Sequence, residues 1–171
     1  YQHLFNQLNI PAQNVHLPDG LACDVDTACQ AYSNAIEAMG GLDLQLLGIG
    51  SNGHIGFNEP QTSFNSRTHI VELSEQTRID NGRFFDDQNE VPTHAITMGI
   101  QDILNAKEII LVATGSNKTE IMAQLFASAI DEALPASALK QHKNLTIVLD
   151  RDAAALLPEP ALQNAISTLT A

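Results

Sequence analysis

Positive charge is scarce in this sequence: its 171 residues include 8 Lys and Arg against 20 Asp and Glu, a formal net charge of −12 at pH 7. Nucleic acids and anionic membranes carry the same sign of charge, so neither is an expected partner. An anionic ligand would have to be held by a few well-placed groups. No run of 18 apolar residues is present either, and the sequence therefore predicts no membrane-spanning helix.

Cysteines and metal-ligand patterns are also scarce. Cys23 and Cys29 are too few for a disulfide framework and have no paired histidines at zinc-finger spacing. We expect free thiols in a reducing cytoplasm. The histidines show no metal-ligand spacing and no carboxylate cluster indicates Mg²⁺ or Zn²⁺, so we expect neither a metal nor an organic cofactor.

The apolar residues predict the fold class. Short apolar runs alternate with stretches of helical period, which is typical of an α/β protein with an open, mostly parallel sheet and helices on both faces. We predict a single domain over residues 1–171, with strands at 42–48, 68–73, 108–114 and 144–149. Helices are predicted at 24–39, 97–105, 116–129 and 136–141, with a last helix after Pro160. Asp24 or Asp26 would cap the first helix, and Gly40 and Gly41 would end it.

Three of the predicted strands are followed by glycine-rich or acidic loops, at residues 48–53, 115–118 and 150–152. In open parallel sheets, ligands bind beyond the carboxyl ends of the strands, where helix N-termini offer free backbone N–H groups. We therefore expect these loops to lie at one edge and to form the functional site.

The loop after the first strand carries the most chemistry. Gly48, Gly50 and Gly53 would allow close approach of the backbone to a ligand, although glycine-rich turns alone are weak evidence for phosphate binding. His54 follows them, and Glu59 lies five residues further on. A histidine can move protons near neutral pH, and a carboxylate can fix its tautomer. From these residues alone, a surface histidine with an incidental glutamate remains an equal alternative.

Residues 48–60 read Gly-Ile-Gly-Ser-Asn-Gly-His-Ile-Gly-Phe-Asn-Glu-Pro. This segment resembles the signature of glucosamine-6-phosphate deaminases, which convert glucosamine 6-phosphate and water to fructose 6-phosphate and ammonia. The resemblance continues in the family's order over residues 66–69, 81–85, 91–92, 95–100, 115–118 and 135–139. It implies a Rossmann-like fold of the deaminase/isomerase type. The related 6-phosphogluconolactonases share the fold and the Gly-His core but usually differ after it, so residues 57–60 favour the deaminases.

The resemblance also implies roles for single residues. His54 would move a proton during opening of the sugar ring, and Glu59 would orient it, on a substrate loop that includes Gly48, Gly50 and Gly53. Asn52 stands where aspartate is common, although asparagine also occurs in a shorter branch of the family. Because an amide carries no charge, His54 should be less basic than in relatives with aspartate.

Two cations would bind the substrate phosphate: Arg83 of the Asn-x-Arg-Phe-Phe segment and Lys118 of Gly-Ser-x-Lys. Spacing alone leaves open that Lys118 is simply solvated at the first turn of a helix. Arg83, between Gly82 and two phenylalanines, could equally serve packing or a surface ion pair. No metal site is implied by the resemblance.

The family's glycine- and threonine-rich phosphate loop and its Asp-Glu-Tyr segment, whose aspartate removes the C2 proton, are absent from this sequence. We therefore expect the C-terminal two-thirds of the fold, incomplete at the N-terminus, with exposed apolar surface and without turnover by itself. His69 and Val71 occupy positions where allosteric members carry basic residues, so we expect a short, non-allosteric type that is a monomer or small homo-oligomer. A galactosamine-6-phosphate isomerase or deaminase, a 6-phosphogluconolactonase and a non-catalytic sugar-phosphate-binding domain are the alternatives.

Overall fold

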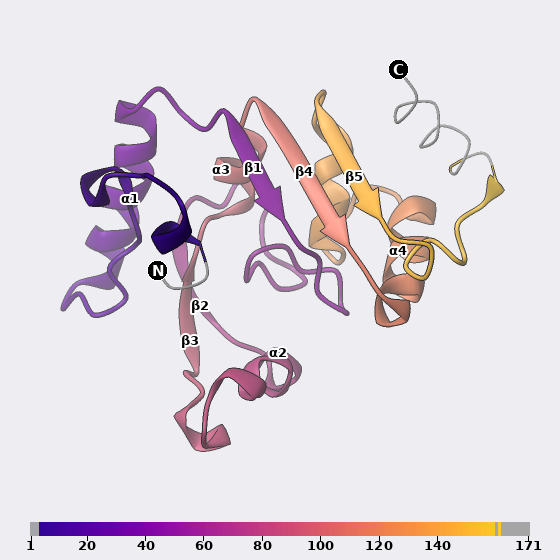
Figure 1. The fold of residues 1–171 in the computed structure, drawn as a ribbon, viewed down its shortest axis with the longest axis horizontal. Coiled ribbons are helices and arrows are strands. Elements are labelled where there is room, and N and C mark those ends of the chain that lie inside the picture. The colour runs from indigo at the N-terminus through magenta and orange to yellow at the C-terminus, as the bar shows by residue number, and fades with distance from the viewer. Residues whose placement is uncertain (1–3, 160, 162–171) are drawn as a thin grey trace.

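The computed structural model describes residues 4–159 and 161. Its centre is a parallel three-stranded sheet in the order β1-β4-β5, formed by β1 (Leu44–Leu47), β4 (Glu108–Ala113) and β5 (Leu145–Leu149). All three strands point the same way, so the loops that follow them gather at one edge of the sheet (Figure 1). This arrangement confirms the α/β class with a mostly parallel sheet and the shared edge predicted for the three loops.

One face of this sheet carries the hydrophobic core. Alternate residues of the central strand β4 point toward it, and Ile109 and Leu111 are fully buried. Three segments pack against this face: α3 (Ile100–Leu104), α4 (Thr119–Ala127) and η6 (Pro135–Gln141). The main residues they contribute are Ile103, Ile121, Met122, Leu125 and Leu139. Alternation of period two in the strands thus places their larger apolar side chains under the helices.

The opposite face of the sheet is more open. Leu44 and Leu46 of β1 and Val148 of β5 are 51%, 64% and 47% exposed. The strand register places Leu46 beside Ile110, so these side chains form one apolar surface rather than isolated spots. The expected exposed apolar surface is confirmed on this face of the sheet.

The prediction that residues 68–73 belong with the parallel strands is wrong. β2 (His69–Glu72) pairs antiparallel with β3 (His94–Thr97) in a separate two-stranded sheet. The helix predicted at 97–105 is correspondingly shorter, because Thr97 ends β3 and α3 begins at Ile100. Between them Gly99 packs so closely on the carbonyl groups of Ser66 and Arg67 that a side chain there would collide with them. This close approach turns the chain from strand to helix.

The helices differ from prediction mainly in their ends. α1 (Val25–Ala38) is capped by Asp24, whose carboxylate accepts from the N–H of Thr27, and is followed by Gly40 and Gly41 at positive φ, as predicted. The helix predicted at 116–129 is η5 (Ser116–Lys118) followed by α4, and the one at 136–141 is the 3-10 helix η6. The helix predicted after Pro160 lies outside the described residues except for residue 161.

The helix α2 (Glu75–Asn81) has no counterpart in the sequence prediction. Ser74 caps it by accepting from the N–H of Thr77. Short 3-10 helices complete the structure at η1 (Phe5–Gln7), η2 (Ala12–Asn14), η3 (Gly82–Phe84) and η4 (Gln88–Glu90). The segment from α2 to η4 forms a lobe that projects on the side toward which the parallel strands point (Figure 1).

A buried carboxylate joins α1, α3 and the residues that precede β2. Asp102 of α3 accepts hydrogen bonds from the hydroxyl of Ser33 in α1 at 2.9 Å and from the N–H and hydroxyl of Thr68 at 2.7 and 2.9 Å. Arg67 donates to the same carboxylate and also to Glu37 of α1. Both oxygens of Asp102 thus accept hydrogen bonds within the protein, and these bonds tie the residues before β2 to α1 and α3.

No helix among the described residues is long and apolar enough to cross a membrane. The cysteines of the sequence are free thiols, with Cys29 buried in α1 and Cys23 exposed before it.

Candidate functional site

The loop that follows β1 is shaped around a histidine ring. The N–H of Gly50 donates to the carbonyl of His54 at 2.9 Å, and the imidazole lies directly over Gly50, where a Cβ would collide with it. Gly53 has φ +84°, and a side chain there would meet Leu134. Gly48 has open space around it, with its nearest neighbour the carbonyl of Val112 at 4.0 Å. Two of the three predicted loop glycines therefore have a steric reason: Gly50 makes room for the His54 ring, and Gly53 makes room for Leu134.

His54, Asn52 and Glu59 form a chain of hydrogen bonds. Nδ1 of His54 lies 2.7 Å from Oδ1 of Asn52, and Nδ2 of Asn52 donates to Oε2 of Glu59 at 2.7 Å. The structure thus brings together the three residues predicted as catalytic, and Asn52 stands between the other two. The direct distance from His54 Nδ1 to Glu59 Oε2 is 3.9 Å.

This chain fixes the imidazole tautomer. The carboxylate of Glu59 can only accept, so the side of Asn52 facing it must be the amide NH₂, and the carbonyl oxygen then faces His54. The same oxygen also accepts from the backbone N–H of His54 at 3.2 Å. Nδ1 of His54 therefore carries the proton in the neutral ring, and Nε2 keeps its lone pair available as a base.

The second oxygen of Glu59 is held by α2. Oε1 accepts from the hydroxyl of Thr77 at 2.5 Å and from the hydroxyl of Ser74 at 3.1 Å. Sequence reasoning missed both residues, because they act from a helix that it did not predict. The spacing of Ser74 and Thr77 around an acidic Glu75 is a helix-start pattern and could have indicated α2, but nothing local indicates that their hydroxyls reach Glu59.

Burial and charge set the protonation of the pair. Burial is the largest influence on the pKa of His54 and lowers it, and the positive charge of Lys118 lowers it further. The negative charges of Glu59 and Asp80 act to raise this pKa, but the net shift is below the ordinary value. For Glu59, burial acts to raise the pKa, but hydrogen bonds from Thr77, Asn52 and Ser74 and the charge of His54 outweigh it, and the net shift is downward. The resting state is a neutral imidazole beside an ionised carboxylate.

Lys118 ends the 3-10 helix η5, at the carboxyl end of β4. Gly115 begins the turn with φ +88°, and its N–H donates to the carboxylate of Asp150 at 2.8 Å. The loops after β4 and β5 are therefore in direct contact. Lys118 lies close enough to His54 to influence the imidazole electrostatically, although the two belong to different loops.

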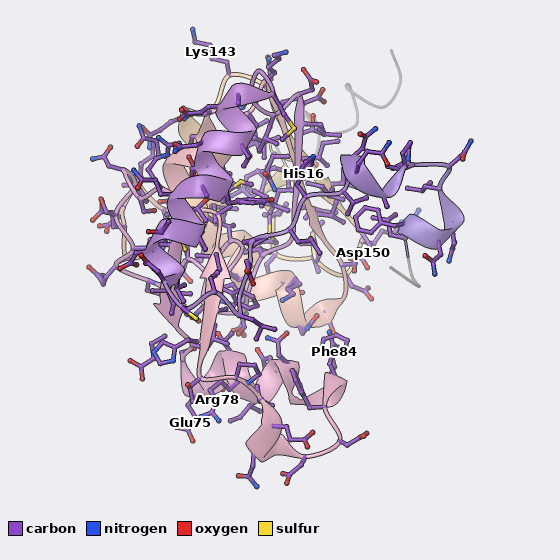
Figure 2. All side chains as sticks on the ribbon, turned by 90° about the vertical axis from the view of Figure 1, so that its left-hand side faces the viewer. His16, Glu75, Arg78, Phe84, Lys143 and Asp150 are labelled. Atoms are coloured by element: carbon purple, nitrogen blue, oxygen red, sulfur yellow. The ribbon has the colours of Figure 1, made fainter. Side chains whose placement is uncertain are left out.

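Arg83 lies in η3, directly after α2, and is exposed. Its guanidinium lies over the ring of Phe84, 4.8 Å from the ring centroid. Figure 2 shows Glu75, Arg78 and Phe84 on the same projecting lobe. Arg83 thus belongs to the segment whose first turn holds Glu59, and its contact in this structure is with an aromatic ring. The role of Arg83 in phosphate binding stays a prediction.

Residues 4–159 and 161 contain no group of three or more His, Cys, Asp or Glu side chains that could hold a metal ion. The Glu59 carboxylate and the Asn52 amide bond instead to protein groups, in the chain that runs from α2 to Nδ1 of His54.

A family model described as glucosamine-6-phosphate isomerases/6-phosphogluconolactonase matches residues 1–148. A glucosamine-6-phosphate deaminase of Shouchella clausii (strain KSM-K16) is 51% identical over 160 residues, covering 94% of this chain and 65% of the relative. One of Lysinibacillus sphaericus (strain C3-41) is 55% identical over 148 residues, covering 86% of this chain and 62% of the relative. The chain spans less than two-thirds of the length of these curated relatives.

Solved structures agree with the family match. A monomeric glucosamine-6-phosphate deaminase superposes with a TM-score of 0.81 at 50% identity, covering 82% of this chain and 58% of the other. A 6-phosphogluconolactonase from Thermotoga maritima superposes with a TM-score of 0.65 at 20% identity, covering 86% of this chain and 61% of the other. The second likeness concerns the fold alone.

Proposed function

Because the chain belongs to the glucosamine-6-phosphate isomerase/6-phosphogluconolactonase family, we propose that it binds glucosamine 6-phosphate in the cytoplasm and contributes ring opening and phosphate binding to the isomerising deamination that yields fructose 6-phosphate and ammonia. The observation that carries this proposal is the hydrogen-bonded chain of Glu59, Asn52 and His54 with Lys118 within electrostatic reach. Relatives that are about half identical bear the deaminase name, and one solved relative is described as monomeric, which supports a monomeric state.

His54 is suited to opening a sugar ring. Opening requires a base that takes the proton of the C1 hydroxyl and returns a proton to the ring oxygen, while the bond from C1 to the ring oxygen breaks and a carbonyl forms at C1. Nε2 of the neutral imidazole can take that proton, since Nδ1 already carries one. The imidazolium so formed is stabilised by Asn52 Oδ1 and by the charge of Glu59, and general acid–base help of this kind is worth about 10²–10⁴ in rate.

The phosphate of the substrate would be bound by Lys118, with backbone N–H groups at the start of the η5–α4 helical segment, and by Arg83. Lys118 lies at the carboxyl end of β4, where anions bind in open α/β sheets. Each charge-assisted hydrogen bond to the phosphate is expected to contribute about 1.5–3 kcal/mol. To bind the phosphate, Arg83 would have to give up its contact with the Phe84 ring.

The residues above supply ring opening and phosphate binding. The later proton transfer from C2 requires a further base, which the family places in an Asp-Glu-Tyr segment that this sequence does not contain. For the 171-residue chain we therefore propose binding of the phosphorylated amino sugar, with complete turnover only in a protein that also provides that segment.

The test follows two products. The chain, and a longer protein that contains it together with the Asp-Glu-Tyr segment, are incubated separately with glucosamine 6-phosphate, galactosamine 6-phosphate and 6-phosphogluconolactone, while ammonia and acid are measured. We expect ammonia from glucosamine 6-phosphate with the longer protein only. Acid from the lactone without ammonia would make the protein a lactonase. Release of neither product, with calorimetric binding of a phosphorylated sugar alcohol retained, would leave a binding domain.

A further inference from the structure

Glu59 bonds to both the histidine loop and the start of α2. Its Oε2 accepts from Asn52, and its Oε1 accepts from Thr77 at 2.5 Å and from Ser74 at 3.1 Å. With both oxygens engaged, rotation of the carboxylate would break a bond at one end or the other. The geometry points to Ser74 and Thr77 as positioning residues, whose hydroxyls fix Glu59 in the orientation that keeps the His54 proton on Nδ1. This inference deepens the proposed function and rests on it for its catalytic meaning.

The two hydroxyls are well placed for this task. Thr77 is 1% exposed, and its hydroxyl donates to Glu59 and lies 2.9 Å from the hydroxyl of Ser74. Ser74 also caps α2 through the N–H of Thr77. A surface helix can be capped by one side chain with no further partner, so the engagement of both hydroxyls with a carboxylate of the histidine loop is beyond what capping requires.

The consequence for His54 follows from hydrogen-bond direction. Asn52 presents its carbonyl to His54 only as long as its NH₂ faces an acceptor, and that acceptor is Oε2 of Glu59. If Glu59 turns or takes up a proton, the NH₂ of Asn52 loses its acceptor, and this orientation of the amide is no longer favoured over the flipped one. The imidazole would then populate both neutral tautomers, and Nε2 would carry a proton in part of the molecules, where it cannot act as a base.

The same bonds attach α2 to the histidine loop. Because η3 and Arg83 follow α2 directly, Ser74 and Thr77 also hold the start of the segment that carries the proposed phosphate arginine. The hydroxyl pair thus connects the proton-transfer chain with the lobe. Removal of the Thr77 hydroxyl should therefore change the tautomer of His54, although Glu59 and Asn52 lie between the two residues along the hydrogen-bonded chain.

The experiment compares Thr77→Val with Thr77→Ser and Thr62→Val. Valine keeps the volume of threonine and removes the hydroxyl, whereas serine keeps the hydroxyl. Thr62→Val is the matched control, since the Thr62 hydroxyl donates to the backbone carbonyl of Glu59 at 2.7 Å and not to its carboxylate. NMR of the labelled 171-residue chain measures the ¹⁵N shifts of the His54 ring at a pH where the ring is neutral, which report its tautomer. The ¹³C shift of the Glu59 carboxyl is followed as a function of pH, which reports proton binding to Glu59.

In the unmodified chain, in Thr77→Ser and in Thr62→Val, we expect the Nδ1–H tautomer to dominate. In Thr77→Val we expect a mixture of tautomers and proton binding to Glu59 tighter by about tenfold, the scale of one hydrogen bond to a charged group. Unchanged tautomer and unchanged Glu59 titration in Thr77→Val would overturn the inference, as would an equal change in Thr62→Val. None of these readouts needs turnover, so a failed ammonia assay would not affect them.

If Thr77→Val does not fold, Ser74→Gly tests the same point, since glycine is tolerated as a helix cap at little cost. It removes one of the two donors to Glu59 Oε1 and leaves Thr77 in place. We expect a smaller shift in the same direction at both His54 and Glu59. A Ser74→Gly chain that matches the unmodified one in both signals would contradict the role of the hydroxyl pair.

Discussion

Replacing Asp102 by alanine should destabilise the fold more than any change to an exposed ion pair. The carboxylate accepts from Ser33, from the N–H and the hydroxyl of Thr68, and from Arg67, and it is almost fully buried. Alanine would leave these donors without an acceptor, and the Thr68 and Ser33 donors are themselves buried. Removal of one partner from a buried charged network costs about 3–5 kcal/mol, a large part of the roughly 5–15 kcal/mol that stabilises a domain.

The assay is urea unfolding followed by circular dichroism at constant pH. With a slope of about 2 kcal/mol per molar urea, a loss of about 4 kcal/mol lowers the midpoint by about 2 M. Asp43→Ala is the control: Asp43 pairs with Lys107 at 2.6 Å, but both side chains are largely exposed. Water and salt already screen that pair, so we expect no change beyond error.

Asp102→Asn separates charge from shape in the same assay. The amide keeps one oxygen for Thr68 but places its NH₂ against another donor, so the midpoint should lie between those of Asp102→Ala and the unmodified chain. The reasoning would be refuted if Asp102→Ala and Asp43→Ala shifted the midpoint equally. It would also be refuted if Asp102→Asn were as stable as the unmodified chain, because the charge of the carboxylate would then contribute nothing.

Two further changes test the site itself. Gly50→Ala should push the His54 ring out of place and lower the ring-opening activity of a turnover-competent protein by about 10² or more. Gly20→Ala, outside the site and with nothing within 4 Å of an added Cβ, should leave activity unchanged; equal effects would show that the ring does not depend on the contact with Gly50. Lys118→Ala should raise the pKa of His54, because the positive charge that helps to lower it is removed, and should weaken binding of a phosphorylated sugar alcohol about tenfold or more. NMR titration and calorimetry would measure the two, and an unchanged or lower pKa would contradict the proximity of Lys118.

Sequence patterns predicted those parts of the fold that depend on local order. The strands β1, β4 and β5 have long apolar runs, and α1 has both a capping aspartate and a terminating pair of glycines, so each was placed to within a few residues. The antiparallel pairing of β2 with β3 was not predicted. Both strands are four residues long, and the close contact of Gly99 with the carbonyl groups of Ser66 and Arg67 that accompanies the pairing is not indicated by any local pattern.

The same distinction holds within the site. His54, Asn52 and Glu59 lie within eight residues and could be grouped from the sequence, and the structure joins them by hydrogen bonds. Ser74 and Thr77 lie fifteen and eighteen residues after Glu59 and reach it only because α2 folds back on the loop. Sequence reasoning therefore predicted the residues proposed for chemistry better than those that hold them in place.

The presence of asparagine at position 52 has a physical consequence for the whole relay. A carboxylate at that position would face Glu59 at the 2.7 Å now spanned by a donor and an acceptor, and two carboxylates so close cannot both stay ionised. Asn52 avoids this conflict by donating to Glu59 and accepting from His54, so that it transmits orientation without adding charge. Glu59 can then remain ionised on the strength of its three donors. The imidazole, kept neutral by burial and Lys118 and drawn toward protonation by Glu59, is left able both to take a proton and to return it.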